Sequence, residues 1–138
     1  MLQHHVAAGR VYAALRSRTE SKPGLRFSDW CNEHHAAKDF DRVVMRVLQP
    51  DGTVRREETG IQPDGVFFID YEGGRTLFFV EMELDQPLKK WKEKVYAYES
   101  YHDSAVLQAR YRCGAFVLLG IARTRRVSGG CWRRQARR

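Results

Sequence analysis

The sequence has few cysteines, and their number and spacing argue against two classes of small protein. Only three of the 138 residues are cysteine, namely Cys31, Cys113 and Cys131. The number is odd and no two lie in a Cys-x-x-Cys spacing, which argues against a disulfide framework and against a zinc ribbon. We therefore expect reduced thiols in a cytoplasmic protein.

The chain also lacks a long hydrophobic run. No apolar segment approaches the roughly 18–20 residues that a transmembrane helix needs. The N-terminal segment MLQHHVAAGRVYAALRSR has neither the apolar core nor a clear cleavage site of a secretory signal. We expect no membrane partner, and the length is enough for one domain with one core.

Acidic residues are missing from the end of the chain. Residues 122–138 contain seven arginines and no aspartate or glutamate: Arg123, Arg125, Arg126, Arg133, Arg134, Arg137 and Arg138. The other 17 of the 24 basic residues equal the 17 acidic ones, so the net charge of +7 belongs to this segment. We predict a domain over 1–121 and a basic tail over 122–138. Such a tail is typical of binding to a polyanion, with DNA first, and the alternative is a solvated tail.

The hydrophobic pattern predicts a series of helices and strands. The helices are expected over 4–17 and from Pro87 onward, with Asp85 near the N-cap of the second; the strands are expected over 25–30, 66–71, 76–83 and 114–121. The apolar stripe of the second helix would comprise Leu88, Trp91, Val95 and Tyr98. Residues 106–111 would extend this helix or start another.

Residues 34–57 are ambiguous. Helical spacing of the apolar residues favours a helix over 34–42. Between 43 and 57 the same spacing competes with a hairpin signal, because residues 42–48 and 53–57 flank Gln49-Pro50-Asp51-Gly52, which is a good hairpin turn. Both structures remain open for 43–57.

The order helix, strand, strand, strand, helix, strand, with an insertion between the first two strands, predicts the fold class. A crossover helix before the last strand implies a parallel neighbour for that strand. We therefore expect an α/β protein: a single domain with a small mixed β-sheet flanked by helices.

Three acids lie on the two central strands. Asp64 stands before one strand, and Glu81 and Glu83 lie near the end of the next, on the same face by strand alternation. The turn at residues 72–75 lies at the other end of the hairpin, so the three carboxylates should converge. Mg²⁺ or Mn²⁺ prefers such an oxygen-rich site. The alternative is a strand cap at Asp64 and two surface acids paired with lysines.

The same residues resemble a known family. Pro63-Asp64 followed by Glu81-x-Glu83 resembles the PD-(D/E)xK nuclease superfamily, which has a restriction-endonuclease-like αβββαβ core. The segments PDGVFFID, GRTLFFVEMELD and LKKWKEKVYAYESY are similar to the replication-relaxation family of plasmid and phage proteins. The resemblance implies a DNA-associated, Mg²⁺-dependent nicking enzyme or endonuclease, with replication or mobilisation proteins as further partners.

The resemblance also implies roles for single residues. Asp64, Glu81 and Glu83 would hold the metal. The nuclease pattern has a lysine where this chain has Glu83, so Lys94 of the following helix is the candidate replacement, with Lys90 second. Arg123, Arg125, Arg126, Arg133 and Arg134 would contact DNA. The missing strand lysine also leaves open a non-catalytic adaptor that binds DNA or a protein.

Other candidates are weaker. Glu33 is either a fourth acid of the site or a charge at a helix N-terminus. The pairs His4-His5 and His34-His35 are not expected to bind zinc, because adjacent side chains point in different directions. The aromatic residues of the second helix, Trp91, Tyr96, Tyr98 and Tyr101, favour core packing over base stacking.

Overall fold

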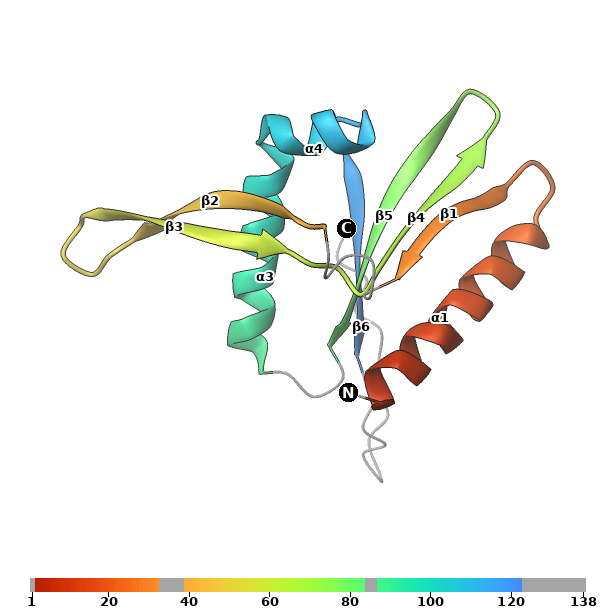
Figure 1. The fold of residues 1–138 in the computed structure, drawn as a ribbon, viewed down its shortest axis with the longest axis horizontal. Coiled ribbons are helices and arrows are strands. Elements are labelled where there is room, and N and C mark those ends of the chain that lie inside the picture. Colours follow the sequence, from red (N-terminus) through yellow and green to blue (C-terminus); the bar gives the residue numbers. More distant parts are fainter. Residues whose placement is uncertain (1, 33–38, 84–86, 123–138) are drawn as a thin grey trace, which may run out of the picture.

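The computed structural model describes residues 2–32, 39–83 and 87–122, in which one helix is followed by five strands, two helices and a last strand (Figure 1). In chain order they are α1 (Leu2–Glu20), β1 (Arg26–Asn32), β2 (Asp41–Leu48), β3 (Val54–Ile61), β4 (Gly65–Tyr71), β5 (Gly74–Glu83), α3 (Leu88–His102), α4 (Ala105–Tyr111) and β6 (Phe116–Ala122). Together they form one small α/β domain, as the sequence predicted.

Four strands form one sheet in the order β1-β4-β5-β6. Strands β1, β4 and β5 are antiparallel, and β6 lies parallel to β5 after the connection through α3 and α4. The predicted mixed sheet is therefore confirmed. Strands β2 and β3 are inserted between β1 and β4 and form a separate two-stranded sheet.

The central hairpin follows its predicted boundaries closely. Strands β4 and β5 pair from Gly65↔Val80 to Tyr71↔Gly74. The turn between them includes Gly73, whose φ of 91° is costly for any residue with a Cβ.

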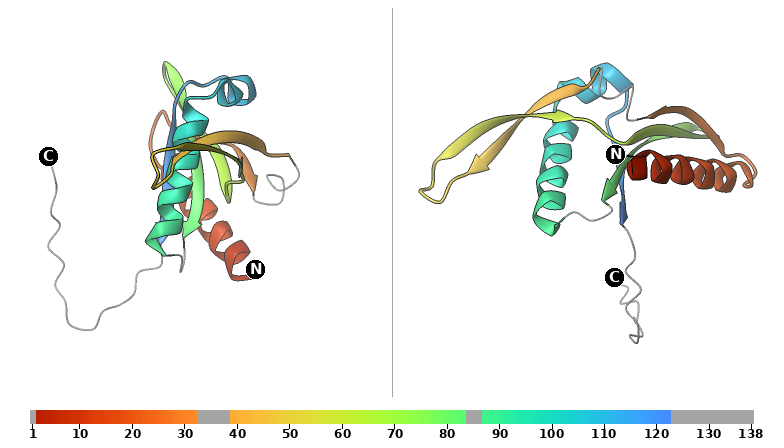
Figure 2. Two further views of the ribbon diagram at one scale, coloured as in Figure 1. Left: turned by 90° about the vertical axis from the view of Figure 1, so that its left-hand side faces the viewer. Right: turned by 60° about the horizontal axis from the view of Figure 1, so that its bottom comes forward.

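Strand β5 is covered on both faces, as its continuous apolar segment predicted. Leu77 and Phe79 are fully buried on the side of α3 and α4. Val80 and Met82 alternate with them and are buried with Phe67, against residues of α1. Helix α1 packs on one face of the sheet, near β1 and β4, and α3 packs on the opposite face (Figure 2).

The ambiguous segment is a hairpin. Residues 33–38 lie outside the described part of the chain, but the expected helix does not reach residue 42, because β2 begins at Asp41. The turn decides the competition: Thr53 donates its backbone N–H to Asp51, and Gly52 has a φ of 83°. Local turn chemistry therefore prevails over the helical spacing of the apolar residues.

Helix α3 begins after Pro87, which is its N-cap residue, and Asp85 lies outside the described residues. The predicted apolar stripe is only partly correct. Leu88 is 66% exposed, because the first turn of α3 extends past the core, and the buried residues are Ala97, Tyr98 and Tyr101. The fully buried side chains therefore lie in the second half of the helix, whereas Trp91 of the first half packs over Gly120 of β6.

The end of the described chain consists of a short helix and an edge strand. Residues 105–111 form a separate helix, α4, which ends at Arg112 in a left-handed conformation. Strand β6 is only half buried, because it lies at the edge of the sheet; Val117 is 40% exposed. Within residues 2–32, 39–83 and 87–122, none of the helices has the length and apolar character to cross a membrane.

The base of the β2–β3 hairpin is tied to α3 and α4. Tyr101 of α3 donates its hydroxyl to Asp41, the first residue of β2. Arg110 of α4 donates to Asp41 at 2.8 Å and also to Asp39. These contacts hold the hairpin across α3, and its far end extends beyond the helix (Figure 1).

Candidate functional site

Asp64 lies at the point where β4 begins, and its own peptide group extends the pairing of β4 with β5. Its backbone N–H donates to the carbonyl of Val80 at 2.9 Å. Its carboxylate Oδ2 accepts the backbone N–H of Met82 at 2.6 Å. The side chain is therefore held by β5, in the position expected of a strand cap, and the residue is only 9% exposed.

The glycine that follows Asp64 is required by packing. A Cβ at Gly65 would overlap the indole ring of Trp30. Since β1 and β4 pair at this point, with Asn32 opposite Gly65, only a residue without a side chain lets the two strands meet. The Pro63-Asp64-Gly65 motif thus has a structural reason for its glycine that the other such motif, at residues 50–52, does not share.

Glu81 projects from β5 toward α3 and is buried, with 4% of its surface exposed. Lys94 donates its ammonium group to Oε2 at 2.8 Å, and Tyr98 donates its hydroxyl to Oε1 at 2.7 Å. Lys94 and Tyr98 are four residues apart on α3 and therefore lie on the same face of the helix. The sequence singled out Lys94, and the structure brings it to one of the predicted acids.

The electrostatics of the cluster reflect its burial. Loss of water raises the pKa of the Glu81 carboxyl; hydrogen bonds from Lys94 and Tyr98 oppose this effect, and the negative charge of Asp64 adds to it. Burial, with the charges of Glu81 and Asp64, also raises the pKa of Tyr98 well above its usual value. The charge of Asp64 acts on both neighbours, so the four side chains form one electrostatic unit.

Two of the three predicted acids, Asp64 and Glu81, therefore belong to one cluster. The structure does not place the side chain of the third acid, Glu83. The backbone of Glu83 pairs with Ala122 of β6, but its side chain lies outside what the structure describes. The alternation along β5 agrees with the prediction, because Met82 is buried on the face opposite Glu81.

Tyr98 is the residue of this cluster whose role was not predicted. The sequence indicated a buried aromatic residue, which is correct, but did not indicate that its hydroxyl binds an acid. The spacing Lys94-x-x-x-Tyr98 carried the signal, because residues four apart share a helix face. A hydroxyl on the same face as a lysine, opposite a strand acid, has a natural acceptor.

The carboxylates of Asp64 and Glu81 are of the ligand type that Mg²⁺ prefers. Among the described residues, no three His, Cys, Asp or Glu side chains stand close enough together to hold a metal ion by themselves. Mg²⁺, however, is commonly bound by one or two carboxylates and completes its six ligands with water and substrate phosphates. Asp64 and Glu81, both acidic and at the same end of adjacent strands, fit this mode of binding.

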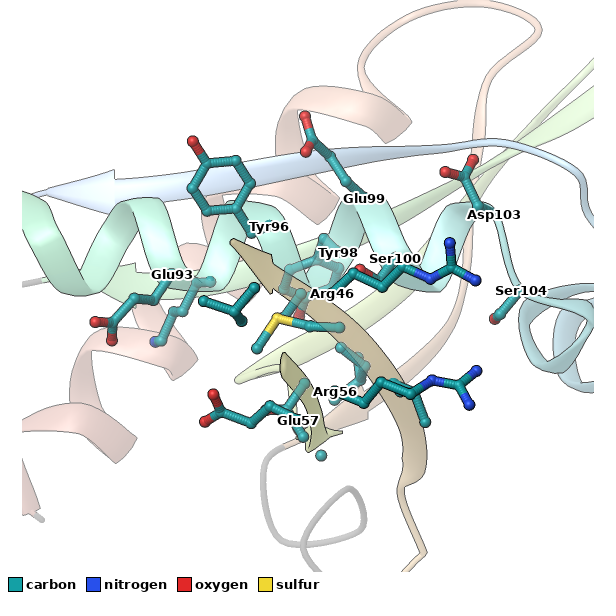
Figure 3. A pocket seen from close by; sticks show the side chains of 18 of the residues that line it. Arg46, Arg56, Glu57, Glu93, Tyr96, Tyr98, Glu99, Ser100, Asp103 and Ser104 are labelled. Atoms are coloured by element: carbon teal, nitrogen blue, oxygen red, sulfur yellow. The ribbon is translucent and has the colours of Figure 1, made fainter. Parts of the chain in front are cut away.

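A groove of about 1550 Å³ opens beside the cluster, between the β2–β3 hairpin and α3. Glu81, Lys94 and Tyr98 line it together with residues of both hairpin strands. Figure 3 shows Tyr98 of α3 and, facing it across the groove, Arg46, Arg56 and Glu57 of the hairpin.

Lys90, the second lysine candidate, also lines the groove and is exposed, but among the described residues the side-chain partners of Glu81 are Lys94 and Tyr98. The cluster is therefore accessible from the groove. Lys94, with a third of its side chain exposed, lies between the buried cluster and the groove.

The remaining candidates divide into residues with a structural role and residues that the structure does not describe. Trp91 packs over Gly120 and Tyr101 is buried, as core packing predicts, whereas Tyr96 is 61% exposed. Burial raises the pKa of the Cys31 thiol, which does not suit a nucleophile. Glu33, the pair His34-His35, Cys131 and the arginines of the tail lie outside the described residues, as do the side chains of His4 and His5.

Comparison of the chain with models of protein families, with curated proteins and with solved structures finds no significant match.

Proposed function

We propose that this protein is a DNA-associated, Mg²⁺-dependent phosphodiesterase of the replication-relaxation type, with a nuclease-like fold. The observation that carries the proposal is the meeting of Asp64, Glu81 and Lys94 at one end of the sheet, with Lys94 supplied by α3. The nuclease pattern requires two acids and a lysine, and a lysine from the next helix replaces the one missing at Glu83. When the inserted β2–β3 hairpin and the short α4 are set aside, the order helix, three strands, helix, strand also supports the proposal.

The roles of the residues follow from their contacts. Asp64 and Glu81 would hold the metal, with Glu83 as a further ligand. A bound Mg²⁺ would offset negative charge on the phosphate and lower the pKa of a bound water. Met82 holds the Asp64 carboxylate through its backbone N–H, and Tyr98 orients Glu81. The ammonium group of Lys94 would stabilise negative charge on the scissile phosphate.

A second candidate is a non-catalytic adaptor that binds DNA or a replication protein. One observation favours it: both oxygens of Glu81 already accept hydrogen bonds from groups of the protein. In that case the cluster is a satisfied buried network that joins β5 to α3, and the arginine tail carries the DNA affinity.

A plasmid-nicking assay with Mg²⁺ and with Mn²⁺ separates the two candidates. The test variants are Asp64→Asn, which keeps an acceptor for Met82, and Lys94→Met. We expect each to lower the nicking rate about 100-fold or more, as loss of a charge-stabilising group does. The matched control is Lys90→Met, which removes an exposed lysine one turn earlier on α3 and should leave the rate unchanged.

The alternative results are also informative. Salt-sensitive DNA binding by the wild type without any metal-dependent nicking would support the adaptor. Absence of both nicking and binding would contradict any direct action on DNA. Nicking that survives in Asp64→Asn and Lys94→Met would assign the chemistry to other residues.

A further inference from the structure

The β2–β3 hairpin places two arginines directly opposite each other. Arg46 and Arg56 are cross-strand partners in the antiparallel register, and both are exposed. Figure 3 shows their side chains extending in the same direction. Like charges in directly opposite positions oppose strand pairing, so this arrangement has a cost that the folded chain alone does not explain.

The other arginines of the hairpin are paired. Arg42 forms an ion pair with Glu58 at 3.1 Å, and Arg55 forms one with Glu57 at 2.9 Å. Within the part of the chain that the structure describes, neither Arg46 nor Arg56 has an ion pair or a hydrogen bond through its side chain. The hairpin thus neutralises two of its arginines and leaves an adjacent pair of positive charges.

The face that carries this pair has a second unusual property. Strand alternation places Val44 and Leu48 on the same face as Arg46, and Leu48 pairs with Val54. These three apolar side chains are 51%, 73% and 57% exposed, respectively. The opposite face is the one that packs on the core, through Val43 and Ile61. The outer face therefore presents the guanidinium groups of Arg46 and Arg56 among uncovered apolar residues, beside the ion pair of Arg42 with Glu58.

We propose that this outer face of the β2–β3 hairpin binds duplex DNA, with the ribbon in the major groove and Arg46 and Arg56 on phosphates or guanine edges. A two-stranded β-ribbon fits the width of the major groove, and a guanidinium group forms paired hydrogen bonds with phosphates and with guanine. The positive charge of the Arg46–Arg56 pair is complementary to such a ligand, and apolar neighbours suit the methyl groups of thymine.

The choice of DNA as the occupant rests on the proposed function. The groove lined by both hairpin strands is also lined by Glu81 and Lys94, so a duplex held by the hairpin lies beside the proposed catalytic cluster. The groove lining as a whole is not basic, because its five acids balance its five basic residues: Glu57, Glu81, Glu93, Glu99 and Asp103 against Arg46, Arg55, Arg56, Lys90 and Lys94. Arg46 and Arg56, however, stand opposite each other on the hairpin and form no ion pair among the described residues, so the local excess of positive charge lies there and directs the duplex to the hairpin.

The test measures binding of a short fluorescent DNA duplex to the full chain in EDTA, where no cleavage occurs. We expect the double variant Arg46→Gln/Arg56→Gln to weaken binding about tenfold or more and to lower the slope of log K against log salt by about two. Thermal unfolding should show a fold that is intact and no less stable, because the repulsion between the two arginines is removed.

Single variants provide the matched control. Arg56→Gln and Arg55→Gln remove the same charge from neighbouring positions of β3, but their side chains lie on opposite faces of the ribbon. Binding should weaken in Arg56→Gln and change much less in Arg55→Gln. A duplex RNA of the same sequence should bind more weakly, because its major groove is too narrow for the ribbon.

The outcomes distinguish the two proposals. If the wild type binds DNA and Arg46→Gln/Arg56→Gln binds equally well, the hairpin proposal is wrong and the proposed function remains. Equal losses in Arg55→Gln and Arg56→Gln, or equal affinity for RNA, also overturn the hairpin proposal, because net charge alone would then explain binding. If the wild type does not bind DNA, both fail.

Discussion

Helix α3 presents two tyrosines to two carboxylates, and the two resulting clusters have nearly the same composition. Tyr98 donates to Glu81, which also binds Lys94 and lies near Asp64. One turn later, Tyr101 donates to Asp41.

The second cluster is completed by Arg110, which binds Asp41 and the further acid Asp39. Each cluster thus contains two acids, a tyrosine and a cation.

The clusters differ in the exposure of one acid, Asp39, and its pKa shift has the opposite direction to that of Glu81. Burial raises the pKa of Glu81. Asp39 has an 80% exposed side chain, and hydrogen bonding to Arg110 lowers its pKa. Composition alone therefore does not decide whether an acid is destabilised or stabilised in its charged form; the extent of desolvation does.

The two cations are almost equally exposed, with 33% of the Lys94 side chain and 30% of the Arg110 side chain accessible, and they differ in their contacts. Arg110 lies on α4 and binds two acids, Asp39 and Asp41. It joins the start of β2 to the helices, which is a structural role. Lys94 donates to Glu81 at 2.8 Å and lines the groove. The Glu81 cluster thus adjoins the groove, as the proposed function requires, whereas the Asp41 cluster joins two elements of the fold.

Replacing Lys94 should have the largest effect on stability. We expect Lys94→Met to lower the free energy of unfolding by about 2 kcal/mol at pH 7, because it leaves a buried carboxylate without its cation. The loss should shrink at low pH, where Glu81 takes up a proton. Urea titrations at the two pH values measure it, with Lys90→Met as the exposed control. A loss that does not depend on pH would show that Glu81 is not its origin.

Replacing Arg110 should have a smaller effect that is concentrated in the hairpin. We expect Arg110→Met to cost about 1 kcal/mol, because Asp41 keeps the hydrogen bond from Tyr101 and Asp39 is well solvated. Hydrogen exchange should become faster in β2 and β3 and change little in β4 and β5. The control is Arg42→Met, whose ion pair is exposed on both sides. Uniform loss of protection throughout both sheets would contradict the proposal that Arg110 stabilises the β2–β3 hairpin locally.

The smallest effect concerns the pH dependence that Glu81 contributes. Since its folded pKa is raised, the folded state holds this proton more tightly than the unfolded state, and wild-type stability falls as pH rises from the unfolded pKa, roughly 4.3, through the raised one. Glu81→Gln should lack this fall, so its stability relative to wild type should increase over that window and then level off. Chemical unfolding across a pH series measures the difference. A difference that runs in the opposite direction would mean that the pKa of Glu81 is lowered by its partners.

The sequence alone was sufficient for the features that depend on neighbouring residues. The alternation and turn residues of the β4–β5 hairpin predicted its two strands, and the apolar segment of β5 predicted burial on both faces. Strand alternation also placed Glu81 opposite Met82. For residues 43–57, helical spacing and turn chemistry conflicted, and the turn at Asp51 and Gly52 decided the outcome.

What only the tertiary structure decided is which groups meet across the fold, and therefore which charges lose water. Leu88 fits the apolar stripe of α3 but is 66% exposed, because within the described part of the chain it lies beyond the core that covers the later turns of the helix. Tyr98 and Tyr101 both read as core aromatics, yet their hydroxyls reach different acids from distant strands. Desolvation depends on everything that packs around a group, and residue spacing carries little of that information.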